Sequence, residues 1–262
     1  MELLEIAGLS FLGVLAYMTG VWLLSLVRRD ASVVDVFWGL GFALLAAAYL
    51  IATDGFGGRK ILITALVAIW GLRLSIYILL RNRSKGEDYR YRKWRGQAGA
   101  SFWWISLFRV FLLQGLLLWI ISMPILAVQF NKDPGHFTVF DLAGTLIWGM
   151  GFFFEAVGDW QLARFKADPA NKGRVMRSGL WAYTRHPNYF GDATVWWGHF
   201  VIAARTLWGV WTLFSPVLMT VLLLRVSGVA LLEKTQVRTK PEYRDYIEST
   251  SAFLPRPPRK RR

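Results

Sequence analysis

The sequence predicts an all-helical protein that crosses a membrane about seven times. Hydrophobic residues make up 55% of the 262 residues and charged residues only 18%, against roughly 45–50% and 25% in a soluble domain. The hydrophobic residues also fall in long blocks, and a block in lipid must satisfy its own backbone polar groups, as a helix does. We therefore expect one integral membrane domain over residues 1–262, and the composition excludes a soluble globular enzyme, a disordered chain and a repeat array.

A helix needs roughly 20 apolar residues to cross a hydrocarbon core of ~30 Å. The first apolar block follows Glu2 and Glu5 rather than a basic region and precedes Arg28, so we expect a retained transmembrane helix and not a cleaved signal. The sixth block is short and leads almost directly into the seventh, which predicts a hairpin. The expected spans are Ile6–Val27, Val33–Ala52, Ile61–Leu80, Phe102–Val128, Val139–Val157, Ala193–Ala204 and Leu207–Leu232.

The distribution of lysine and arginine predicts the orientation. Of the 31 bases, 24 lie in alternate connections that begin with Arg28, 4 lie in the other connections and three lie inside spans. Basic loops face the cytoplasm. We therefore expect the N-terminus outside, and a cytoplasmic face formed by loops 81–101 and 158–191 and the tail 233–262. A bacterial inner membrane and an endoplasmic reticulum both remain open.

Charge and composition also limit the kinds of ligand that we expect the protein to bind. The net charge is +14, but the basic residues lie between apolar blocks rather than on one soluble face. We therefore expect no nucleic acid as a partner. The chain has no cysteine, and its three histidines show no ligand spacing, so we expect no metal site. No glycine-rich nucleotide fingerprint is present. Any nucleotide must therefore be held by side chains of helices and loops.

The third span carries polar residues on one face. Because helical residues recur on one face every three to four positions, a single side of this helix presents Arg73, Tyr77, Arg81 and Ser84. One interpretation is that the bases extend towards the interface. The following run, GEDYRYRKWR, instead interleaves Asp88 and Tyr91 with bases, and a polar ligand pocket uses all three residue types.

The fifth span places Glu155, Asp159 and Lys166 along one face. Carboxylates near a bilayer edge are costly unless they are paired. These acids are expected to form an inter-helix salt bridge or to accept from hydroxyl or amide groups of a ligand. In the second case Lys166 and Arg174 would meet the ligand's phosphates.

Residues 179–200 contain the most informative turn. Pro187 forces His186 out of helical geometry, and Asn188 then stands where a helix N-cap belongs. Arg185, His186 and the free N–H groups of the helix start would converge on one place, which suits an anion such as phosphate. The alternative is an interfacial turn with a snorkelling arginine.

In the tail, Tyr243 and Tyr246 share one side of a short helix, and the basic end suits anionic lipid.

These motifs resemble those of the DUF1295 group in the steroid 5-alpha-reductase-like superfamily of membrane proteins. The signature is Gly-Leu-Trp at residues 179–181 followed by Arg-His-Pro-Asn-Tyr-Phe-Gly-Asp at residues 185–192. The resemblance extends over most of the chain, through the runs at residues 35–39, 70–75, 86–91, 154–174 and 250–255.

The resemblance implies seven helices that hold NADPH in a cavity open to the cytosol, beside a substrate cavity open to lipid. Asn188, Gly191 and Asp192 match the family's Asn-x-x-Gly-Glu/Asp element, which lines the cofactor pocket. Asp159 falls at the adenine-ribose position and Lys166 at a phosphate contact. The remaining expected cofactor residues are Arg73, Arg81, Asp88, Tyr91, Arg174, Arg185, His186 and Tyr243, the last in a tail element that closes over the cofactor.

The substrate half of the site departs from the steroid reductases. Those proteins have a Gln-Glu pair on the second helix and a Tyr on the third, whereas this chain has Asp35 as its closest acid and Trp70 at the aligned position. We expect an NADPH-dependent reductase of a lipophilic C=C bond conjugated to a carbonyl, with the substrate drawn from the bilayer. Tyr77 or Tyr189 would donate to the developing enolate, and Asp35 would orient the donor.

Two other classes remain open. An S-adenosylmethionine-dependent methyltransferase resembling the isoprenylcysteine carboxyl methyltransferases has a related Arg-His-Pro-x-Tyr-x-Gly element and would use the same pocket. The bases at Arg164, Lys166, Lys172 and Arg174 disfavour it, because that ligand has no phosphate. The other class is a non-catalytic lipid-binding membrane protein. Buried charge on three helices argues against it, since apolar replacement would cost less.

Overall fold

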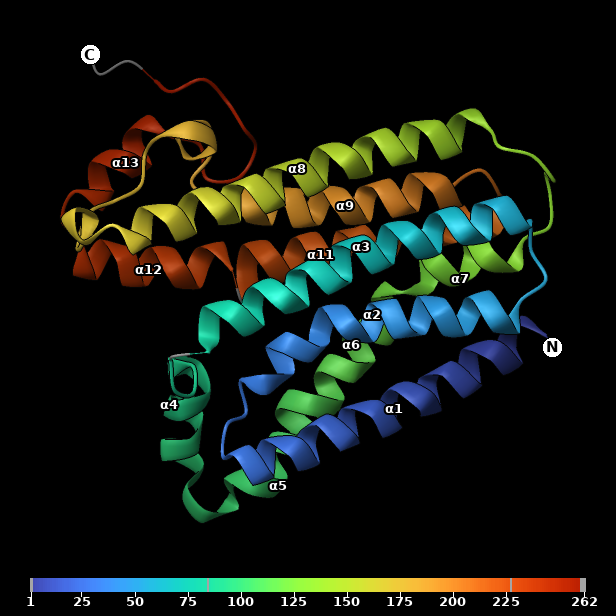
Figure 1. Ribbon diagram of the computed structural model, residues 1–262, viewed down its shortest axis with the longest axis horizontal. Helices are drawn as coiled ribbons and strands as arrows, with labels where there is room; N and C mark the ends of the chain where they lie inside the picture. Colours follow the sequence, from blue (N-terminus) through green and yellow to red (C-terminus); the bar gives the residue numbers. More distant parts are fainter. Residues whose placement is uncertain (1, 84, 227, 260–262) are drawn as a thin grey trace. The chain divides into compact units, whose positions relative to one another are not determined.

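The structure, a computed structural model, describes residues 2–83, 85–226 and 228–259 (Figure 1). These residues form helices joined by short loops, and no strand occurs among them. The predicted all-helical fold class is confirmed. Ser84, expected on the face of Arg73, and the last three residues of the basic tail lie outside the described residues.

Six helical stretches of the described chain are long and apolar enough to cross a membrane, which makes the protein a multi-pass membrane protein. Each coincides with an expected span. The remaining expected span, Ala193–Ala204, lies in α9 (Pro187–Ala203), a helix of only 17 residues. The six stretches are α1 (Leu3–Arg28), α2 (Val33–Ala52), α3 (Gly57–Asn82), the helical run Tyr89–Phe130, α8 (Val139–Ala167) and the run Leu207–Val226.

The chain divides into two compact units, Met1–Thr138 and Val139–Arg262, called unit 1 and unit 2 below. Within unit 1, the run Tyr89–Phe130 is built from several helical segments. They are α4 (Tyr89–Ala98), a 3-10 turn (Gly99–Ser101), α5 (Phe102–Ser106), a π-helical turn (Leu107–Leu112), α6 (Leu113–Ile121) and α7 (Met123–Phe130).

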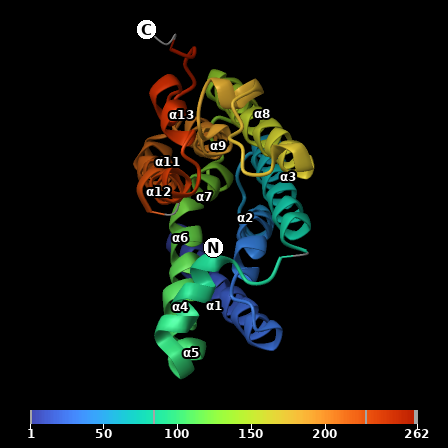
Figure 2. The same ribbon diagram turned by 90° about the vertical axis from the view of Figure 1, so that its left-hand side faces the viewer.

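Within unit 1, α2 and α3 pack closely because two glycines face each other. A Cβ atom added to Gly39 would lie 3.1 Å from the carbonyl carbon of Gly71. The backbone N–H of Leu40 donates to the Ser75 hydroxyl oxygen at 2.9 Å, one turn from the glycine contact. Small residues let membrane helices approach until their backbones touch, which replaces the hydrophobic drive that lipid cannot supply. The two helices are neighbours in both views (Figures 1 and 2).

Unit 2 is built around the antiparallel pair α8 and α9 (Figure 1). The remaining elements are 3-10 turns at Pro169–Asn171 and Gly179–Ala182, α10 (Leu207–Val210), a 3-10 turn (Trp211–Leu213), α11 (Phe214–Val221), a π-helical turn (Leu222–Val226), α12 (Val229–Thr239) and α13 (Tyr243–Ser249).

Glycines spaced seven residues apart form the contact between α8 and α9. Gly144, Gly151 and Gly158 lie on α8, while Gly191 and Gly198 lie on α9, and seven residues make about two helical turns. An added Cβ atom on Gly198 would lie 2.7 Å from the Gly144 oxygen, and one on Gly191 would lie 2.5 Å from the Gly151 oxygen. This seam fixes the start of α9 against the cytoplasmic-facing end expected for α8, where the predicted site residues lie.

We expect Gly198→Ala to lower the free energy of unfolding by about 1–3 kcal/mol, because its methyl group would overlap the α8 backbone. The matched control is Gly149→Ala, also on a helix, where an added Cβ has nothing within 4 Å. Unfolding of both variants in mixed micelles is the measurement. Equal stability of the two variants would contradict the glycine seam.

Candidate functional site

The start of α9 lies against α8 through a partly buried amide–carboxylate pair. The Asn188 amide nitrogen donates to the Asp159 carboxylate at 3.0 Å, and Asp159 is only 4% exposed. The Asn188 amide oxygen accepts from the N–H of Tyr189 at 3.1 Å. On the neighbouring turns, Glu155 is buried on α8 and Asp192 follows Asn188 on the same side of α9.

The expected N-cap position of Asn188 is wrong by two residues. His186 is the N-cap, with φ −139°, and Pro187 is the first helical residue. Proline favours this first position because its missing N–H has no helical partner there. Asn188 is therefore already helical, and its side chain is free to reach across to α8.

Arg185, directly before this turn, is 6% exposed and has its donors occupied by the tail. Its Nε donates to Glu233 Oε1 at 2.8 Å and its Nη2 donates to Oε2 at 3.2 Å, a two-pronged pair with a carboxylate on α12. Its Nη1 donates to the carbonyl oxygens of Ile247, at 3.1 Å, and Thr250. The guanidinium group thus ties the loop to the two last helices.

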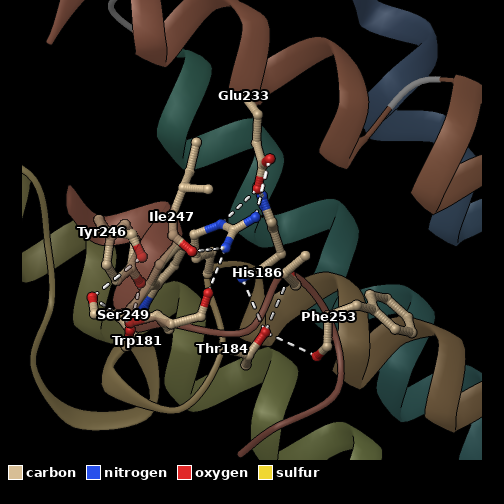
Figure 3. Close-up of polar contacts among 11 residues, drawn as sticks. Trp181, Thr184, His186, Glu233, Tyr246, Ile247, Ser249 and Phe253 are labelled. Atoms are coloured by element: carbon tan, nitrogen blue, oxygen red, sulfur yellow. Dashed lines mark hydrogen bonds and ion pairs between the residues drawn. The ribbon is translucent and has the colours of Figure 1, made fainter. Parts of the chain in front are cut away.

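His186 reaches the same carboxylate. Its Nε2 lies 3.1 Å from Glu233 Oε1 (Figure 3). Its ring stacks on Tyr189, with centroids 5.5 Å apart and planes 2° from parallel. Arg185 and His186 do converge, but within the described chain the anion between them is the carboxylate of Glu233, where a phosphate was expected. Burial raises the pKa of Glu233, but the hydrogen bonds from His186 and Arg185 outweigh it and hold the pKa at about 2.

The tail also closes on the loop through its backbone. The Arg185 N–H donates to the Ser251 oxygen at 2.9 Å, and the Thr184 hydroxyl donates to the Phe253 oxygen at 2.8 Å (Figure 3). The Tyr246 hydroxyl donates to the oxygen of Trp181, whose indole N–H donates to the Gly158 oxygen at 3.0 Å. The loop is therefore held between α8 and the tail.

Tyr243 lies on α13 in this segment of the tail. It is buried, and its ring centroid is 5.6 Å from that of Tyr246. Burial and the negative charge of Glu233 raise the pKa of Tyr243 to about 12. Its phenol is therefore a neutral donor at physiological pH.

Some bases of the segment that runs from the end of α8 to Arg177 contact the tail, and others are exposed. Arg177 donates to the Glu242 carbonyl oxygen and lies 5.7 Å from the Tyr246 ring centroid. The Lys240 ammonium donates to the Arg174 carbonyl oxygen at 2.7 Å, while the side chains of Lys166 and Arg174 are exposed. The two predicted phosphate contacts thus lie on one exposed segment of unit 2.

In unit 1, Asp35 joins two of the other predicted residues. The Tyr91 hydroxyl donates to Asp35 Oδ1 at 2.7 Å, and Arg90 donates to Oδ2 at 2.8 Å. Arg90 Nε also donates to Asp88 at 2.9 Å. Burial raises the pKa of Asp88, but the hydrogen bonds from the side chain and backbone of Arg90 bring it below its ordinary value.

The α3 face predicted from spacing also exists. The guanidinium carbons of Arg73 and Arg81 lie 5.3 Å and 5.6 Å from the ring centroid of Tyr77. The structure therefore groups the predicted residues into four sets. In unit 1 they are Asp35 with Asp88 and Tyr91, and Arg73 with Tyr77 and Arg81. In unit 2 they are Asp159 with Asn188, and Arg185 and His186 with Tyr243 beside Glu233.

Sequence reasoning missed Glu233, Arg90 and the Glu87–Arg95 pair. Arg95 donates to Glu87 at 2.7 and 3.0 Å, and the Ala31 N–H donates to Glu87 at 2.8 Å. Burial raises the pKa of Glu87, but these hydrogen bonds lower it below its ordinary value. The sequence does indicate that Glu233 has a partner. An acid at the end of a span raises the free energy of the folded protein unless a cation pairs with it.

The fold and the polar clusters at its helix ends define a multi-pass helical membrane protein. Residues 21–250 match the family described as "Protein of unknown function (DUF1295)". The chain belongs to the DUF1295 family, which confirms the family resemblance. No curated protein is significantly similar to the chain. No solved structure is significantly similar to it.

The depressed pKa of Glu233 makes tail closure dependent on pH. Because its folded pKa lies below the ordinary 4.5, the carboxylate contributes stability above pH 4.5 that is lost as the pH falls through about 2. We expect Glu233→Gln to cost roughly 1.5–3 kcal/mol at pH 7 and to flatten this acid dependence. The measurement is the unfolding free energy from pH 7 to pH 2, with hydrogen exchange of α13 as a local readout.

Glu248→Gln is the matched control, since Glu248 is exposed on α13. It should leave both the stability at pH 7 and its acid dependence unchanged. An acid dependence in Glu233→Gln identical to that of the unmodified chain would show that Glu233 does not hold the tail.

Proposed function

We propose that the protein is a membrane reductase that uses NADPH to reduce a lipophilic C=C bond conjugated to a carbonyl. The observation that carries this proposal is the partly buried Asn188–Asp159 pair, which lies where α9 begins against α8. Asn188 belongs to the Asn-x-x-Gly-Asp element that, in the reductases the chain resembles, lines the cofactor pocket. The glycine of that element, Gly191, is part of the seam that brings the two helices together.

The donor set suits a phosphorylated dinucleotide. Asp159 and Asn188 offer a carboxylate and an amide for ribose hydroxyl or carboxamide groups, and Tyr243 offers a neutral phenol. Lys166 and Arg174 are exposed bases for phosphates. The further cofactor contacts that the resemblance implies are Arg73, Arg81, Asp88 and Tyr91. When bound, NADPH supplies the hydride.

Arg185 and His186 act in this proposal as positioning residues. Their side chains hold Glu233 and the carbonyl oxygens of the tail, so the loop before α9 stays in place. The stacked ring of His186 also fixes the plane of Tyr189. Asp35 accepts from Tyr91 and Arg90 and thereby orders the start of α4.

Reduction of a conjugated C=C bond places negative charge on the carbonyl oxygen, and a positioned donor must meet it. Tyr189, held against His186, and Tyr77, held between Arg73 and Arg81, are the proposed donors. Apolar side chains exposed on the spans would let a lipophilic substrate enter from the bilayer.

The first test is thermal unfolding of the detergent-purified protein with NADPH, NADH and S-adenosylmethionine in parallel. A ligand at ~100 times its Kd should add roughly 2.7 kcal/mol of stability. We expect NADPH to stabilise the protein, and we expect Asn188→Ala and Lys166→Gln to abolish the effect. Lys132→Gln, which removes an exposed base in unit 1, is the matched control and should keep it.

Stabilisation by S-adenosylmethionine alone would replace the reductase by the methyltransferase. If none of the three ligands stabilises the protein, both enzymatic proposals fail, and the motif is structural in this chain.

The donor assignment is tested by Tyr77→Phe and Tyr189→Phe. Loss of one oxyanion donor should lower turnover about 10²–10³-fold. The affinity for NADPH should stay nearly unchanged, because the phenyl ring remains. NADPH oxidation with conjugated ketones in mixed micelles gives the first quantity, and the thermal shift gives the second. Parallel loss of turnover and affinity would reject the residue as a donor.

A further inference from the structure

A groove of about 780 Å³ lies in unit 1, where the ends of α1 and α3 meet the start of α2. Its volume falls within the roughly 300–1,000 Å³ of ligand-binding pockets. Apolar side chains of α2 and α3 form its inner wall, among them Val36, Leu40, Leu72 and Ile76. This groove contains none of the residues that carry the proposed reductase site.

The depth of the groove matches one leaflet of a bilayer. Its lining extends along α3 from Leu72 to Asn82, and ten residues of helix measure about 15 Å. That is half of a hydrocarbon core of ~30 Å. Leu72 and Ile76 are 44% and 55% exposed on this expected span, so the wall is open towards lipid.

The mouth of the groove is basic. Arg28, Arg83 and Lys85 line it and are exposed, and within the described parts of the chain these three side chains make no hydrogen bond or ion pair. The one acid in the lining is Asp30. It accepts from the N–H and the hydroxyl of Ser32, at 2.8 and 2.5 Å, and so serves the turn before α2. Among the described residues of the lining, the three bases thus outnumber the one acid, and none of them is paired with it.

We propose that this groove binds one anionic glycerophospholipid. Its phosphate would lie among Arg28, Arg83 and Lys85, and an acyl chain would run along the apolar wall of α2 and α3. The positive-inside distribution of bases puts this mouth at the expected cytoplasmic interface, where anionic lipids concentrate. The proposal is independent of the proposed reductase function.

A second cavity of unit 1 shows what distinguishes the groove. It measures about 410 Å³, lies between α1 and α2, and has no charged residue in its lining. An acyl chain alone would suit either cavity. Only the larger groove joins an apolar wall of leaflet depth to unpartnered bases, and this combination selects a lipid with an anionic headgroup.

The test is native mass spectrometry of the full chain in neutral detergent. Phosphatidylglycerol and phosphatidylcholine with identical acyl chains are titrated in parallel, with glycerol 3-phosphate as the chain-free probe. We expect one phosphatidylglycerol to bind tightly, and phosphatidylcholine and glycerol 3-phosphate to bind far more weakly. Because each base near an anionic headgroup contributes about fivefold, the double variant Arg83→Gln/Lys85→Gln should weaken phosphatidylglycerol binding about 30-fold.

Two further variants complete the design. Ile76→Trp should obstruct the wall and weaken phosphatidylglycerol binding without changing the charge. Arg92→Gln/Lys93→Gln removes two exposed bases of α4 that do not line the groove and should bind lipid like the unmodified chain. Monodispersity and melting temperature in detergent establish that each variant is folded.

Several outcomes would overturn the proposal. They are equal binding of the two lipids, binding of glycerol 3-phosphate as tight as that of phosphatidylglycerol, phosphatidylglycerol binding that neither groove variant weakens, and equal weakening in the α4 control.

Discussion

Hydrocarbon offers no partner for a hydrogen bond, and the rest of this structure depends on that constraint. Each span satisfies its backbone as a helix, and hydroxyl side chains inside spans donate back to a carbonyl oxygen one turn earlier. Thr19, Thr64 and Thr145 do so at 2.8, 2.8 and 2.7 Å. Hydrocarbon also supplies no hydrophobic drive between helices, so close packing must come from small residues. The glycine seams between α2 and α3 and between α8 and α9 meet this need.

The same constraint favours charged side chains at helix ends, where each is paired with an opposite charge. Asp35 with Arg90 joins α2 to the start of α4, and Glu233 with Arg185 joins α12 to the loop before α9. Removing one partner of such a partly buried pair costs roughly 1.5–3 kcal/mol, because the other charge loses its hydrogen bonds. Each pair therefore fixes two segments of the chain against each other. The first holds the start of α4 against α2, and the second holds the tail against the turn before α9.

Hydropathy and spacing predicted what lies within one helix. The apolar blocks form helices, as predicted. Arg73, Tyr77 and Arg81, which are four positions apart, lie on one face of a helix. The contacts between elements could not be predicted from the spacing of residues, because Arg185 and Glu233 are 48 positions apart and Asp35 and Arg90 are 55 apart. Periodicity carries no information over such distances. The N-cap is His186 and not the predicted Asn188, because the preference of proline for the first helical position outweighs the capping preference of asparagine.

The partners of the bases decide which of them can bind a ligand. Arg90, Arg95 and Arg185 already donate to carboxylates of the chain, so another anion would have to displace an acid that is held by several hydrogen bonds. The chain has 31 bases and only 17 acids, so at least fourteen positive charges must be balanced by anions that are not its own. Exposed bases on the expected cytoplasmic face meet lipid phosphates, soluble phosphates or salt. A ligand site is therefore most sharply located where bases without a partner border a cavity, and position in the sequence alone does not reveal it.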